Sequence, residues 1–91
     1  MAEMIVLARR LGLEEAAPLK MEFLSSRGKD IEVDASQVGH LGTLCLQVLL
    51  AAARERAGSG NAFRLKDPSE AMLSALAHFG LTQENFAGGN A

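Results

Sequence analysis

The sequence predicts that residues 1–91 form a single small α/β domain, with a mixed, mostly parallel β-sheet and helices packed mainly on one face. Segments with strand-like and helix-like patterns alternate three times along the chain, as is typical of parallel sheets joined by helical crossovers. The length suits one hydrophobic core. Apolar residues make up 48% of the chain and charged residues 22%, a balance that is ordinary for a globular protein.

The first strand and the first helix are predicted from the N-terminal third of the chain. Met4–Leu7 is a short apolar run that favours a strand, and this strand can continue to Leu11. Apolar side chains then recur in a roughly helical rhythm over Leu13–Ser25. Proline is tolerated in a helix only within the first turn. We therefore expect the regular part of this helix to begin near Pro18.

The middle of the chain predicts a strand, a long helix and another strand. Asp30–Asp34 alternates charged and β-branched residues, which indicates an inner strand of a parallel sheet. Leu41–Arg56 is the longest apolar segment and predicts the central helix, with Thr43 as its N-cap. The glycine-rich residues 57–61 mark a break, and Ala62–Leu65 predicts the next strand.

The last part of the chain predicts one more helix and a tail. Asp67–Ser69 indicates a turn, and apolar residues recur at helical spacing over Ala71–Gly80. The domain core then covers about residues 4–81, and Thr82–Ala91 is expected to be a flexible, frayed tail. The side chains expected in the hydrophobic core are Ile31, Val33, Leu46, Leu49, Leu50, Phe63, Leu65, Met72 and Leu76.

The central helix carries two apolar stripes. One contains Leu46 and Leu49, and the other, rotated around the axis, contains Leu44 and Val48. A helix that packs on one sheet face buries a single stripe of about 100°. Either the helix is nearly engulfed, or Leu44 and Val48 remain exposed as a docking surface for another protein.

Charge and composition make several functions improbable. The net charge of −2 and the pI of about 5.6 lack the basic excess that nucleic-acid binding requires. The single cysteine, Cys45, excludes an internal disulfide, which suits a reducing cytosol. No basic-then-apolar leader is apparent, and no apolar run is long enough to cross a bilayer. We therefore expect a cytoplasmic protein without membrane insertion.

The sequence offers no pattern for metal, cofactor or catalytic chemistry. His40 and His78 lie far apart, and neither shows metal-ligand spacing with Cys45 or with a carboxylate. The glycine-rich residues 58–60 lack the lysine and serine or threonine of a phosphate-binding loop. We expect Cys45 to be a packed, inert thiol. The chain is thus predicted to bind a partner and not to catalyse a reaction.

The region from Val33 to Leu46 resembles the motif of STAS domains, the sulphate-transporter and anti-sigma-factor-antagonist modules. The family pattern is a strand that ends in Asp-Leu-Ser, a Val two residues later, and a short turn before Asp-Ser-Ser-Gly-Leu opens a Leu/Val-rich helix. The direct matches are Asp34, Ser36, Val38 and Leu46. Asp67–Ser69 also resembles the exit of the family's fourth strand. The resemblance implies the α/β fold predicted above and a role in bacterial signal transduction through protein–protein interaction.

The chain departs from this pattern where the family's regulatory serine lies. The Asp of Asp-Ser-Ser falls on Gly42, the first Ser on Thr43, and the second on Leu44. In regulated relatives an anti-sigma kinase phosphorylates this second Ser. Leucine has no hydroxyl, so the resemblance implies that this phospho-switch is lost. Thr43 is a weak candidate for phosphorylation and is expected to be a helix cap instead.

Finer resemblances suggest three partners. The Ser36–Val38 turn and the helix after it resemble small stand-alone STAS proteins encoded with bacterial chemotaxis genes, which implies docking on a chemotaxis histidine kinase. Thr43 resembles the Thr in the STAS subunit of lipid-transporting ABC systems, which docks on an ATPase. An anti-sigma factor antagonist, which binds an anti-sigma kinase, is the third alternative. The residues expected to bind the partner are Ser36, Gln37, Gly39, His40, Thr43, Leu44, Gln47 and Val48.

Overall fold

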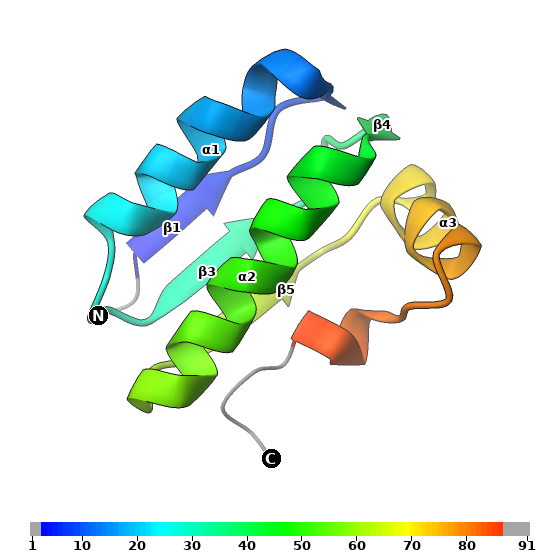
Figure 1. Ribbon diagram of the computed structural model, residues 1–91. Coiled ribbons are helices and arrows are strands. Elements are labelled where there is room, and N and C mark those ends of the chain that lie inside the picture. Colours follow the sequence, from blue (N-terminus) through cyan, green and yellow to red (C-terminus); the bar gives the residue numbers. More distant parts are fainter. Residues whose placement is uncertain (1–2, 87–91) are drawn as a thin grey trace.

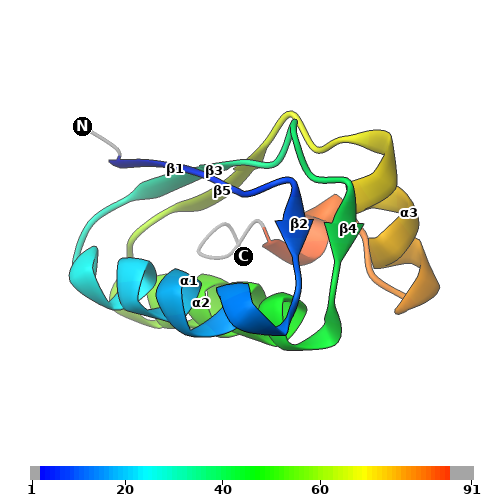
Figure 2. The same ribbon diagram turned by 90° about the horizontal axis from the view of Figure 1, so that it is seen from above.

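The computed structural model describes residues 3–86, which form a sheet layer and a helix layer (Figures 1 and 2). The main sheet has three parallel strands in the order β1-β3-β5. Helices α1 and α2 pack side by side on one face of this sheet, and α3 lies beside its end. The structure therefore confirms the α/β prediction of a mostly parallel sheet with helices mainly on one face. The strands are β1 (Glu3–Val6), β2 (Arg10–Leu11), β3 (Ile31–Asp34), β4 (His40–Leu41) and β5 (Phe63–Lys66).

The strands alternate between a buried face and a face without a helix cover. In β3 and β5, the inward side chains Ile31, Val33, Phe63 and Leu65 are all buried. On the opposite face, residues of opposite charge lie next to each other on the two strands. In the β3–β5 register, Asp34 is opposite Lys66 and Glu32 is opposite Arg64. This alternation, visible in the sequence, places β3 at the centre of the sheet as predicted.

A second, two-stranded parallel ladder joins the two layers. β2 pairs with β4 through Arg10 opposite His40 and Leu11 opposite Leu41. Figure 2 shows this ladder running from the sheet layer to the start of α1 and α2. The predicted continuation of the first strand to Leu11 is thus a separate strand after a break, with a different partner.

The first helix, α1 (Leu13–Ser25), begins five residues earlier than predicted. Pro18 lies inside it on an exposed part of the surface. Proline removes one intrahelical hydrogen bond, here the bond to the Glu14 carbonyl. Because Pro18 is exposed, water can hydrate that carbonyl and the helix can continue through the proline.

The central helix, α2 (Thr43–Ser59), also starts and ends differently from the prediction. Gly42 is the N-cap and Thr43 the first helical residue, so the expectation that Thr43 caps the helix is wrong. The helix ends at Gly60, which adopts the left-handed conformation with φ 78°. Glycine adopts this conformation without strain, which makes it the usual residue after a helix end.

The C-terminal part of the described chain contains α3 (Glu70–His78) and a 3₁₀ helix, η1 (Gln83–Phe86). The Ser69 hydroxyl caps α3 by accepting a hydrogen bond from the Met72 N–H at 3.0 Å. The expected flexible tail began at Thr82, but Phe86 is fully buried, and its ring centroid lies 6.2 Å from that of Phe63. Residues 87–91 of that tail lie outside the described residues.

The hydrophobic core lies between the sheet and α1, α2 and α3. Eight of the nine residues predicted for the core are buried. The exception is Leu50, which is half-buried at the edge of the core, so the structure corrects that prediction. Leu50 follows the fully buried Leu49 in α2. Successive helical side chains point about 100° apart, so the two residues cannot share one environment.

Candidate functional site

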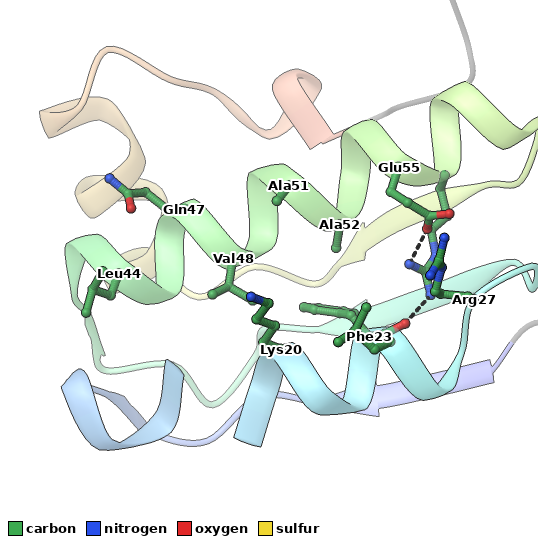
Figure 3. Close-up of a pocket in the computed structure, with 11 residues that line it drawn as sticks. Lys20, Phe23, Arg27, Leu44, Gln47, Val48, Ala51, Ala52 and Glu55 are labelled. Carbon is green, nitrogen blue, oxygen red and sulfur yellow. Dashed lines mark hydrogen bonds and ion pairs between the residues drawn. The ribbon is translucent and has the colours of Figure 1, made fainter. Parts of the chain in front are cut away.

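A groove runs between α1 and α2 on the surface of the helix layer, and we call it the α1–α2 groove (Figure 3). Its volume is about 370 Å³, which lies near the lower end of the range of small-molecule pockets. Its lining is mostly apolar, with charged side chains at one end and along one wall. The lining residues are Lys20, Phe23, Leu24, Arg27, Leu44, Gln47, Val48, Ala51, Ala52, Glu55 and Arg56.

The second apolar stripe of α2 forms one wall of this groove. Leu46 and Leu49 are buried against the sheet, whereas Leu44 is 43% exposed and Val48 is half-buried. The helix is therefore not engulfed, which resolves the alternative that its sequence left open. Ala51 and Ala52 continue the wall (Figure 3), and their short side chains keep the middle of the groove open.

Arg56 closes one end of the groove and is itself buried, with 1% of its surface exposed. Its Nη2 donates to the main-chain oxygen of Phe23 at 3.0 Å, and its Nη1 pairs with the Glu55 carboxylate at 2.7 Å. Its guanidinium also lies 6.0 Å from the centre of the Phe23 ring. These contacts offset the cost of burying the charge. Within residues 3–86, only its Nε is a buried side-chain N or O atom without a hydrogen-bond partner.

Two further cations line the α1 side of the groove. Lys20 and Arg27 are exposed, and within residues 3–86 neither forms an ion pair. The only carboxylate in the lining, Glu55, is already paired with Arg56. Three cations and one carboxylate give the groove a net charge of +2, whereas the whole chain carries −2. The groove is thus an apolar surface with unpaired positive charge.

Three of the eight predicted partner-binding residues meet in the groove: Leu44, Gln47 and Val48. The other five are exposed but lie outside its lining. They are Ser36, Gln37, Gly39, His40 and Thr43.

The Ser36–His40 segment is held by hydrogen bonds to Asp34, at the end of β3, and to Arg9, just before β2. The Ser36 N–H donates to Asp34 Oδ1 at 2.8 Å. Hydrogen bonding by the side chain and the main-chain N–H of Ser36 lowers the pKa of the Asp34 carboxyl, and Lys66 adds a smaller effect. The N–H groups of Gly39 and His40 both donate to the Arg9 carbonyl, at 2.7 and 3.1 Å. These hydrogen bonds stabilise the observed conformation of the loop.

Gly42 lies so close to β2 that the structure leaves no room for a side chain there. The Gly42 N–H donates to the Leu11 carbonyl at 2.9 Å. A Cβ on Gly42 would come to 2.9 Å from that same oxygen, closer than real Cβ contacts. A residue with a side chain here would therefore require the backbone of the β2–β4 ladder to shift. Thr43 and Leu44, the next two residues, are exposed in the first turn of α2.

Cys45 is buried, and its thiol donates to the Gly12 carbonyl at 3.4 Å. Burial raises the pKa of the thiol, and the nearby Glu15 carboxylate raises it further. A raised pKa leaves little thiolate at neutral pH, and the thiolate is the nucleophile. Among residues 3–86, no three His, Cys, Asp or Glu side chains are grouped to hold a metal ion. Over the same range, no helix has the length and hydropathy to span a membrane.

Sequence reasoning missed the α1 side of the groove. It identified Leu44 and Val48 but not Lys20, Phe23, Leu24 and Arg27. One feature of the sequence could have indicated this side of the groove. The α1 segment has more apolar residues than one buried face needs, and Leu24 is among those that remain exposed. Which positions would meet α2 depends on how the two helices cross, and periodicity does not specify that.

Comparison with known proteins gives the class to which this fold and surface belong. The family model described as "Mlab, STAS domain" matches residues 2–86. This match covers nearly the whole chain, so the chain belongs to the STAS domain family. STAS domains commonly mediate protein–protein interactions, which indicates a signalling or protein-interaction role. No curated protein and no solved structure matches the chain.

Proposed function

We propose that this chain is a non-enzymatic, cytoplasmic docking module of bacterial signalling, and that its partner is a chemotaxis histidine kinase. The docking function is carried by the exposure of Leu44 in the first turn of α2, where the α1–α2 groove begins. The choice of a kinase as partner rests on the resemblance of the Ser36–Val38 turn and the following helix to small stand-alone STAS proteins encoded with chemotaxis genes. An apolar side chain at the centre of an interface can supply much of the binding energy, while its neighbours exclude water.

The chemistry of the groove supports binding better than catalysis. Its wall is apolar, and its carboxylate, Glu55, already bonds the buried Arg56. General acid–base catalysis needs a titratable group that is free to exchange a proton with a substrate. Lys20 and Arg27 can attract an acidic partner. Within residues 3–86, neither of them forms an ion pair with another side chain of the groove lining.

The leucine at position 44 supports binding that is not regulated by phosphorylation of this position. Regulated STAS relatives carry a serine there, and phosphorylation would add about −2 charge to the docking surface. Leucine has no acceptor hydroxyl and contributes apolar area instead. We therefore expect the chain to remain competent for docking whatever the state of an anti-sigma kinase, which makes the sigma-regulation alternative the weakest.

A second candidate partner is the ATPase of a lipid-transporting ABC system. It is favoured by Thr43, which is exposed at the first residue of α2 and matches the threonine of such STAS subunits. In this case Thr43, with Leu44, contacts the ATPase. Replacement of Thr43 by Val would then weaken binding, whereas a kinase that docks mainly on Leu44 would tolerate it.

Affinity capture from the native bacterial cytosol tests the proposal, with wild type and Leu44→Asp as matched baits. A histidine kinase that is enriched by wild type and lost with Leu44→Asp supports the first candidate. An ABC ATPase with the same behaviour, and with sensitivity to Thr43→Val, supports the second. If every protein captured by wild type is also captured by folded Leu44→Asp, the proposed docking surface is wrong.

A further inference from the structure

We propose that the partner element that fills the α1–α2 groove is an amphipathic α-helix whose apolar stripe is flanked by acidic side chains. This inference rests on the proposed docking function and adds the chemistry of the partner. Shape, backbone chemistry and charge each support it.

The shape of the groove suits about three turns of helix. The α2 wall extends from Leu44 to Glu55, a distance of about 16 Å at 1.5 Å per residue. The short side chains of Ala51 and Ala52 lie in the middle of this wall. Packed helices approach to about 8–10 Å when large side chains of one fit between small side chains of the other. A helix with Leu or Phe at its central positions therefore fits this gap.

The backbone chemistry favours a helix over an extended strand. Both walls are helices, and apart from the Glu14 carbonyl opposite Pro18, outside the groove lining, the main-chain groups between their ends are hydrogen-bonded within each helix. A strand in this apolar groove would find no partners for its own N–H and C=O groups, and burying them unpaired is costly. A helix satisfies its backbone internally and presents only side chains, as in other helix-in-groove complexes.

The charge of the groove specifies acidic flanks on that helix. Lys20 and Arg27 line the α1 side without ion-pair partners within residues 3–86. Lys20 lies on α1, and Arg27 lies in the turn that follows it, nearer to Glu55 (Figure 3). Carboxylates at two positions along one flank of the incoming helix could therefore pair with the two cations. Complementary charge at the rim of an interface raises the association rate and rejects basic competitors.

A pair of designed peptides takes the place of the unidentified partner in the test. The acidic probe is a lactam-bridged peptide of about 14 residues, long enough for the groove but too short to be a stable helix without the bridge. It carries Leu along one stripe and Glu at two positions along one flank. The basic probe has Lys in place of both Glu residues. Affinity is measured by fluorescence anisotropy, and the contact site by ¹⁵N–¹H chemical-shift changes.

Variants of the groove are compared with matched variants elsewhere on the surface. Lys20→Glu with Arg27→Glu reverses the groove charge, and Ala51→Trp fills its middle. Arg54→Glu with Lys66→Glu makes the same change of charge at exposed residues outside the groove lining. Ala51 is exposed, so its substitution tests the groove without replacing a core residue.

We expect the acidic probe to bind wild type at least about tenfold more tightly than the basic probe, a difference of about 1.4 kcal/mol. The preference should reverse in the Lys20→Glu/Arg27→Glu variant and persist in the Arg54→Glu/Lys66→Glu variant. Ala51→Trp should weaken the acidic probe by at least about tenfold. Shift changes should concentrate on α1 and α2.

Three results would overturn the inference. The first is equal affinity of the two probes for wild type, and the second is no binding of the acidic probe at millimolar concentration. The third is tighter binding of dodecanoate than of the acidic probe in the same groove, which would make it a site for anionic amphiphiles. If one of these occurs while Leu44→Asp still abolishes partner capture, the docking function stands and only the helical partner element is wrong.

Discussion

Arg56 donates a hydrogen bond from Nη2 to the main-chain oxygen of Phe23 at 3.0 Å, and this bond ties α2 to α1 where the two helices close the groove. The same carbonyl also accepts from the Ser26 N–H at 3.2 Å, just after α1 ends. A buried guanidinium thus helps to set the separation of the two helices on which the α1–α2 groove depends.

Replacing Arg56 by Ala should lower the free energy of unfolding by about 3 kcal/mol, because it removes packing and hydrogen bonds from a fully buried site. Arg54→Ala, at an exposed position on the same helix, should change stability by no more than about 0.5 kcal/mol. Urea denaturation of both variants measures the difference. Equal stability of the two would show that the buried contacts of Arg56 contribute nothing net.

Leu49 and Leu50 provide a second matched pair. Leu49 is fully buried and Leu50 half-buried, so Leu49→Ala should destabilise the domain by about 2–5 kcal/mol and Leu50→Ala by roughly half as much. Thermal or urea unfolding distinguishes the two. A larger effect at Leu50 would mean that α2 turns a different side toward the sheet in solution.

Phe86 tests whether the segment after α3 belongs to the folded core. It is fully buried against Phe63, whereas Phe79 at the end of α3 is partly exposed. Phe86→Ala should therefore cost about 3–5 kcal/mol, and Phe79→Ala clearly less. If truncating the ring of Phe86 leaves the unfolding midpoint unchanged, η1 is not docked on β5 in solution.

Asp34 should titrate below the ordinary range of aspartate, because Ser36 hydrogen-bonds to its carboxylate. A pKa that is lower in the folded state means that the ionised form stabilises the fold above the unfolded pKa. This contribution is lost as the pH falls through the lowered pKa of the folded state. A carboxyl titration by NMR measures the pKa directly. Ser36→Ala should raise the pKa of Asp34 part of the way toward that of an ordinary aspartate. An unchanged pKa would exclude the serine hydroxyl as the cause.

The strand β3 was predictable because its apolar and charged side chains alternate. In β3, Ile31 and Val33 must share a face, and a shift by one residue would expose both. The inner position of β3 follows from the same pattern together with the order of the elements. The separate β2–β4 ladder was not predictable, because each of its strands has only two residues, too few to show any periodicity.

The predictions of two helix starts and of the C-terminal tail were wrong for different reasons. Pro18 suggested a late start of α1, but its exposure lets the helix pass through it. Thr43 has the side chain of an N-cap, yet the helix is capped by Gly42, whose N–H bonds the Leu11 carbonyl in the β2–β4 ladder. Phe86 lay in a glycine-rich tail that gave no periodic signal, and its burial depends on a distant contact with Phe63.

Three of the eleven lining residues of the candidate site, Leu44, Gln47 and Val48, were predicted from the sequence, and the others depend on the packing of the helices. The two stripes of α2 and the family motif identified Leu44 and Val48. The groove exists because α1 supplies the opposite wall, including Lys20, and because Arg56 is buried between the helices. A terminal arginine in a helical segment normally lies in water, so its burial had no signal in the sequence.

The central claim is that Leu44 anchors the partner. Leu73 on α3 is a matched control, since both side chains are 43% exposed, and it lies outside the groove lining. Aspartate at position 44 should preserve the fold, because a carboxylate is favourable at a helix N-terminus. Circular dichroism and thermal unfolding of both Asp variants verify that each is folded.

The most direct measurement is isothermal titration calorimetry of the partner captured by wild type, the proposed histidine kinase, with wild type, Leu44→Asp and Leu73→Asp. We predict that Leu44→Asp weakens binding by at least about 2 kcal/mol, because it places an unpaired charge in an apolar interface, and that Leu73→Asp binds like wild type. If folded Leu44→Asp binds the kinase with unchanged affinity, or if Leu73→Asp loses as much affinity, the groove face of α2 is not the docking surface.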